Sequence, residues 1–186
     1  MAQTVDLLKQ LTEKLYKKNP AEINKQPGQT IETRIEQIFA CPVLRSLDEL
    51  DNKSGTDAIL LGFEPDFKGD RVFAIMFGLY SMIHTSYNGK CELFMLDYLD
   101  QQNLYNSARN IEILVWRLKT RKKPDGSPFL LTNAINGDIQ NLSYERIFGK
   151  LIVLQDTMAL VVSKRTGRFI KEAVHMAGMA FLPIGI

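Results

Sequence analysis

DRVFAIMFGLYSMIH, residues 70–84, is the most apolar stretch of this 186-residue chain. Apolar side chains fill almost every position, so a helix formed here must be surrounded by other helices. Gly78 costs about 1 kcal/mol in a helix interior relative to alanine, and its presence predicts a close crossing with another helix. The stretch is shorter than the roughly 18 residues that a membrane-spanning helix needs. We therefore predict a buried central helix.

Helical patterns flank this segment on both sides. Residues 4–18 and 30–40 each begin at a threonine suited to an N-cap and have apolar residues at helical spacing. Further helices are predicted after Asp100, from about residue 143 to 164, and from 168 to 182. The helix after Asp100 has the most regular stripe, with apolar residues at spacings of three and four: Leu104, Ala108, Ile111, Val115 and Leu118.

The connecting segments complete the predicted fold class. Residues 58–63 are apolar and could form a buried strand or an extended wall segment, although a run this short is ambiguous, and residues 91–99 suit either helix or strand. Residues 119–141 are predicted to form a long loop because Pro124, Asp125-Gly126 and Pro128 interrupt the pattern. The prediction is a mainly all-α, single globular domain of five to seven helices with at most a small β element. Residues 1–29 form an N-terminal helix and polar linker, and residues 30–186 form the helical domain.

Composition narrows the class of protein. Hydrophobic residues make up 45% of the chain and charged residues 24%, which is typical of a soluble globular domain and argues against a disordered chain. The 23 basic and 21 acidic residues leave a net charge of only +2, so the balance gives no general attraction to nucleic acid. We expect no nucleic-acid partner.

The cysteines and histidines form no recognisable motif. Cys41 and Cys91 are fifty residues apart, and two separate thiols are favoured over a disulfide. Two Cys and two His at these spacings fit no usual zinc pattern, and no phosphate-binding glycine motif is present, so no metal or cofactor is predicted. His84 is expected to be a hydrogen-bonded packing residue rather than a catalytic partner of Cys91.

One group of charges falls on helices that otherwise look buried: Arg109, Glu112, Glu145, Arg146 and Asp156. A functional interpretation is a carboxylate pair for acid–base chemistry. We favour an ion-pair network between the two helices, because both signs of charge are present and no metal-ligand motif accompanies them. No catalytic residue is therefore assigned.

A basic run lies where the helix after Asp100 should end: Arg117, Lys119, Arg121, Lys122 and Lys123. The helix dipole favours cations at a C-terminus, so the simplest interpretation is a solvated helix end. Contact with anionic lipid head groups is the functional alternative.

Two segments resemble a known family. LYNSARNIEILVWRL (104–118) and NLSYERIFGKLIVLQDTMALVVSKRTGRFIK (141–171) are similar to uncharacterised bacterial envelope lipoproteins, over roughly residues 41–183. The resemblance implies a helical periplasmic or outer-membrane-anchored domain on a lipid tether, with residues 19–29 as part of the spacer. Met1 stands where such a lipoprotein has its acylated cysteine, and a cytoplasmic location is the alternative. The resemblance provides no catalytic residues.

These observations lead to three functional hypotheses. The first is a non-catalytic envelope protein that binds a partner protein through an apolar patch, near residues 129–131 or 181–186. The second is a carrier of a lipid-like or other apolar ligand, built on the Met- and Phe-rich helices 70–84 and 168–182. The third, which we favour least, is a hydrolase that uses Glu112, Glu145 and Asp156.

Overall fold

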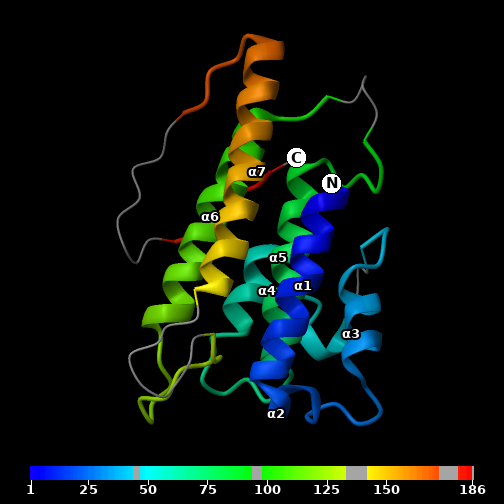
Figure 1. The fold of residues 1–186 in the computed structure, drawn as a ribbon, viewed down its shortest axis with the longest axis vertical. Helices are drawn as coiled ribbons and strands as arrows, with labels where there is room; N and C mark the ends of the chain where they lie inside the picture. The colour runs from blue at the N-terminus through cyan, green and yellow to red at the C-terminus, as the bar shows by residue number, and fades with distance from the viewer. Residues whose placement is uncertain (44–46, 94–97, 133–141, 172–179, 186) are drawn as a thin grey trace.

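The computed structural model describes residues 1–43, 47–93, 98–132, 142–171 and 180–185. Within these ranges the chain forms α-helices and one 3-10 helix but no strand, which confirms the all-α prediction. The elements are α1 (Ala2–Lys18), α2 (Pro20–Ile23), α3 (Ile31–Ile38), η1 (Asp48–Leu50), α4 (Gly55–Leu61), α5 (Arg71–Ser86), α6 (Gln101–Thr120) and α7 (Ser143–Thr166). Figure 1 shows α6 and α7 side by side over much of their length. Among the described helices, none is long and apolar enough to cross a bilayer.

Helix α5 is the centre of the core, as its composition predicts. Every residue of it except Thr85 is buried, and it contacts α1, α3, α4 and α6. Gly78 lies at the crossing with α4. A Cβ atom added there would lie 2.6 Å from the carbonyl oxygen of Gly55 and 2.7 Å from the amide nitrogen of Ile59. The predicted close crossing is therefore confirmed, because only glycine allows the two backbones to approach so closely.

The prediction of a strand or extended segment at residues 58–63 was wrong. Residues 58–61 belong to α4, with Ala58, Ile59 and Leu61 buried, and residues 62–63 form the turn after it. The amide of Gly55 donates a 2.8 Å hydrogen bond to the hydroxyl of Ser81, which anchors the first turn of α4 on α5. Seven residues are too few for a recognisable period, and the tertiary contact with α5 decides the conformation.

A buried polar cluster joins α1, α3, η1 and α5. Arg34 is 1% exposed and forms a bidentate pair with Glu49, at 2.7 and 2.8 Å. Its Nε lies 3.4 Å from a carboxylate oxygen of Asp70, and the Tyr16 hydroxyl donates a 2.7 Å hydrogen bond to the same oxygen. The other oxygen of Asp70 accepts from the amide of Phe73 and so caps α5. The cluster fixes the N-terminal helices on the central one.

The segment after α1 also contacts the body of the protein. Glu22 of α2 is 7% exposed and accepts a 2.7 Å hydrogen bond from the amide of Arg71. The side-chain amide of Asn19 donates to the carbonyl of Leu131 and accepts from the amide of the same residue. Residues 19–23 are thereby bonded both to the start of α5 and to the loop after α6.

The prediction of a final helix over 168–182 was wrong for the described residues of that range. Residues 168–171 and 180–182 are not helical, and residues 172–179 lie outside the described part. Side chains of α6 instead bond the backbone of residues near the end of the chain. Asn110 exchanges two hydrogen bonds with the backbone of Leu182, at 2.7 and 2.9 Å, and Asn106 donates to the carbonyl of Pro183. These amide contacts satisfy the backbone without a helix.

The expectation of two separate thiols was also wrong. Cys41 and Cys91 form a disulfide, with their Cα atoms 5.7 Å apart. Cys41 follows α3, and Cys91 follows the turn after α5. The packing of α3 on α5 brings these two segments together, which spacing along the sequence cannot reveal.

Candidate functional site

The solvent face of α7 is the most apolar exposed surface that the structure describes on a helix. Val153, Leu160 and Val161 are each more than half exposed. Single exposed apolar residues are common on soluble proteins, but several on one helix make that helix a candidate interaction surface. Four cations are interspersed among them, and we call the whole set the α7 face: Arg146, Lys150, Val153, Leu160, Val161, Lys164 and Arg165.

The two carboxylates of α7 are paired with α6 instead of lying on this face. Glu145 forms a 3.1 Å ion pair with Lys119, and Asp156 forms a 2.7 Å ion pair with Arg109. Glu145 and Asp156 are the only acidic residues in α7. The exposed face of the helix is therefore apolar and basic without a compensating acid of its own.

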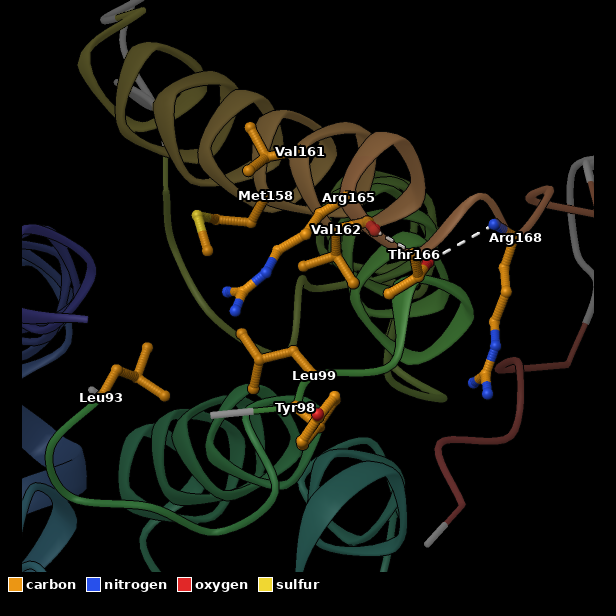
Figure 2. Close-up of a pocket in the computed structure, with 9 residues that line it drawn as sticks. All are labelled: Leu93, Tyr98, Leu99, Met158, Val161, Val162, Arg165, Thr166 and Arg168. Atoms are coloured by element: carbon orange, nitrogen blue, oxygen red, sulfur yellow. Dashed lines mark hydrogen bonds between the residues drawn. The ribbon is translucent and has the colours of Figure 1, made fainter. Parts of the chain in front are cut away.

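A groove of about 640 Å³ borders the C-terminal half of α7. Figure 2 shows α7 on one side of it and the segment before α6, with Tyr98 and Leu99, on the other. The side chain of Arg165 extends from α7 into the space between these two walls. The lining is mostly apolar, with two arginines: Leu93, Tyr98, Leu99, Met158, Val161, Val162, Arg165, Thr166 and Arg168.

The end of α7 positions the second of these arginines. Gly167 adopts a left-handed conformation with φ of 67° and terminates the helix, as its place in the sequence predicts. The hydroxyl of Ser163 then donates a 2.6 Å hydrogen bond to the carbonyl of Arg168. This bond fixes the backbone just beyond the helix, so Arg168 lies beside the groove and Phe169 projects into solvent with 92% of its surface exposed.

A second hollow, of about 470 Å³, lies between the N-terminal half of α7 and the start of α1. Its lining includes Gln3 and Leu7 from α1 and Arg146, Lys150 and Val153 from α7. Each half of the α7 face thus has a recess with apolar walls and two cations. Such recesses can accept apolar side chains of a ligand while the cations contact its negative groups.

The predicted cluster of charges is only partly brought together. Arg109 lies between two carboxylates, 3.2 Å from Glu112 and 2.7 Å from Asp156. Glu145 instead pairs with Lys119, one of the residues of the basic run. Arg146 is exposed and belongs to the hollow near α1. A guanidinium that contacts two carboxylates forms an ion-pair network between α6 and α7.

The basic run does not form one continuous surface. Arg117 is 9% exposed and stacks its guanidinium on the ring of Phe181, 5.1 Å from the centroid. Burial lowers the pKa of Arg117, and the charge of Arg121 lowers it further. Lys119 forms its ion pair with Glu145 of α7. Of the remaining residues, Arg121 and Lys122 are exposed and Lys123 is half-buried. Arg121 and Lys122 thus lie on an exposed helix end, whereas Arg117 lies in a buried setting.

The apolar patch expected at residues 129–131 is buried at its first two positions. Phe129 and Leu130 are 5% and 2% exposed, and the ring of Phe129 meets that of Phe63 edge to face. The sequence pattern predicted a helix over about residues 143–164 but did not identify an exposed apolar face that includes Val161. The signal was present, because apolar residues occupy more of the helix circumference than one buried face requires.

No protein-family model, curated protein or solved structure matches this chain.

Proposed function

We propose that this protein is a non-catalytic helical binding protein of the bacterial cell envelope, and that the α7 face docks an acidic, apolar segment of a partner protein. The observation behind the proposal is the composition of that face. Val153, Leu160 and Val161 are exposed among cations, while both carboxylates of the helix pair with α6. A membrane tether through a lipidated N-terminus remains part of the proposal.

The chemistry of the face defines the partner. Burying an exposed valine or leucine side chain stabilises a complex by about 1.5–3 kcal/mol. The cations add orientation and a faster encounter with a negatively charged partner rather than much affinity of their own. An amphipathic helix with leucine-like residues on one face and carboxylates along its borders matches both features.

The disulfide supports an envelope location. Disulfides persist in oxidising compartments such as the bacterial periplasm and are rare in the cytosol. The bridge between Cys41 and Cys91 is therefore what we expect of a periplasmic domain.

The shared guanidinium of Arg109 argues against the hydrolase hypothesis, because it holds Glu112 and Asp156 in ion pairs.

The test uses two fluorescent peptides of about 18 residues, or five helical turns. Both place leucines on one face, and the other face is glutamate in one peptide and lysine in the second. Fluorescence anisotropy with the full-length protein should show the glutamate peptide binding at least tenfold more tightly. Replacing Arg165 and Arg168 together by glutamate should remove that preference, because it reverses both cations of the groove.

The matched control reverses two exposed lysines that are not part of the α7 face, Lys9→Glu with Lys68→Glu, which changes the net charge equally. This double variant should bind the glutamate peptide like the unmodified chain. Equal affinity for both peptides would contradict the proposal. Binding to phosphatidylglycerol vesicles without binding to either peptide would assign the face to an anionic lipid surface instead.

One observation favours the carrier hypothesis as a second candidate. The groove beside α7 exceeds the roughly 300 Å³ of a small-molecule pocket, and Arg165 and Arg168 are suited to a carboxylate or phosphate head. This groove lies between α7 and the segment before α6, whereas the carrier site expected from the sequence was at the helices predicted over residues 70–84 and 168–182. A carrier should retain a fatty acid or phospholipid in native mass spectra, and Met158→Trp, which narrows the groove, should expel it.

A further inference from the structure

A second cluster of chemically reactive groups lies away from the α7 face. Cys41, His84 and Cys91 place two sulfurs and an imidazole nitrogen within 4.8 Å of one another. Nε2 of His84 lies 3.4 Å from the sulfur of Cys41. Both cysteines are exposed, whereas His84 is 6% exposed. The cluster is open to solvent on its sulfur side and held by the core on its imidazole side.

The surroundings of His84 fix its ring beside the sulfurs. The residue is in the last turn of α5, and its ring packs against that of Tyr80 with centroids 5.7 Å apart. Gly89 has φ of 66°, and its amide donates a 2.9 Å hydrogen bond back to the carbonyl of His84. A Cβ at Gly89 would lie 3.7 Å from the ring, so the turn closes directly over the imidazole. The turn leads into Cys91 and so brings its sulfur to the same place.

These three groups match the ligand preference of zinc. With Zn–S bonds of about 2.3 Å and Zn–N bonds of about 2.0–2.1 Å, a tetrahedral site places sulfur and nitrogen about 3.5 Å apart. The Cys41–His84 separation of 3.4 Å agrees with this value. Two zinc-bound sulfurs lie about 3.8 Å apart, a distance that side-chain rotation can reach when the Cα atoms are 5.7 Å apart.

We propose that, once the disulfide is reduced, Cys41, Cys91 and His84 bind one zinc ion, with water as the fourth ligand. A dithiol supplies the two electrons and two protons: its sulfurs become a cyclic disulfide, and Cys41 and Cys91 become thiols. Zinc then displaces the two thiol protons and forms two Zn–S bonds and one Zn–N bond. The segments after α3 and α5 are thus joined in both redox states, by a covalent bond in one and by a metal in the other.

The test uses the full chain reduced with dithiothreitol, which is then removed by gel filtration without oxygen. Titration with Co²⁺ should produce the thiolate charge-transfer band and the strong visible bands of tetrahedral cobalt, saturating at one equivalent. Zinc should displace the cobalt. The oxidised chain should show none of these bands, because its sulfurs are bonded to each other. Absence of the bands from the reduced chain would overturn the proposal.

Variants identify the ligands. His84→Ala should weaken cobalt binding more than tenfold, and Cys41→Ser should abolish the charge-transfer band at one equivalent. His175→Ala, the matched control for the chain's other histidine, should leave the titration unchanged. If Cys41→Ser does not fold, zinc should still protect both thiols of the reduced chain from iodoacetamide. Unchanged affinity in His84→Ala, or alkylation at the same rate with and without zinc, would contradict the assignment.

Discussion

At the scale of single residues, Arg34 is the cation at the centre of the buried polar cluster. It makes a bidentate contact with Glu49, approaches Asp70 and stacks on the ring of Phe73, 4.1 Å from the centroid. Removing one partner from a buried ion pair leaves the other charge without compensation, which typically costs about 3–5 kcal/mol. Arg34 is therefore central to how α3 is held against α5.

Replacing Arg34 by methionine should lower the free energy of unfolding by about 3 kcal/mol, because Asp70 then loses its nearest cation in a buried setting. Urea denaturation followed by circular dichroism measures the change. The control is Glu13→Ala, which breaks an exposed pair with Lys17 and should cost less than about 1 kcal/mol. A similar small loss in both variants would show that the buried cluster contributes no more than a surface ion pair.

At the scale of elements, the sequence predicts best where local signals and packing agree. Thr30 caps α3 as expected, Asp100 caps the helix predicted to follow it, and α5 is the buried central helix. Thr4 does not cap the first helix, because α1 already begins at Ala2. The errors fall where distant contacts decide. The α4 segment is helical because it packs on α5, and Leu182 lies outside a helix with its backbone hydrogen-bonded to Asn110. The α7 face was missed because sequence alone does not show which sides of an apolar helix its neighbours cover.

Two glycines test the crossing of α4 and α5. Gly78→Ala should destabilise the protein by about 1–3 kcal/mol, because the added methyl meets backbone atoms of α4 at 2.6 and 2.7 Å. Gly149→Ala in α7 is the matched control, since nothing lies within 4 Å of its added methyl. It should instead stabilise the protein by up to about 1 kcal/mol, the difference in helix propensity. Thermal unfolding of both variants should show shifts of opposite sign, and a stabilising Gly78→Ala would contradict the close crossing.

At the scale of the whole molecule, buried tyrosines tie stability to alkaline pH. Burial raises the pKa of Tyr16, Tyr80, Tyr87 and Tyr144, in the last case to about 12. An unfolded tyrosine ionises near pH 10, so unfolding releases protons above that pH. The contribution of these tyrosines to the free energy of unfolding should therefore be fully present below about pH 10 and decline from pH 10 to 12. Urea unfolding across this range measures how steeply the free energy of unfolding falls with pH. Tyr144→Phe should make this fall less steep. An unchanged pH dependence would show that Tyr144 does not contribute to it.

The disulfide acts on the molecule as a whole because it closes a loop of fifty residues that contains α4 and α5. Such a loop restricts the unfolded chain, and its closure contributes about 4 kcal/mol on the entropic model. Reduction in the presence of a chelator should therefore lower the free energy of unfolding by roughly that amount, and the double variant Cys41→Ser with Cys91→Ser should match the reduced chain. Adding zinc should restore part of the lost stability in the reduced chain but none in the double variant. A loss below about 1 kcal/mol would mean that the packing of α3 on α5 already holds the two segments together.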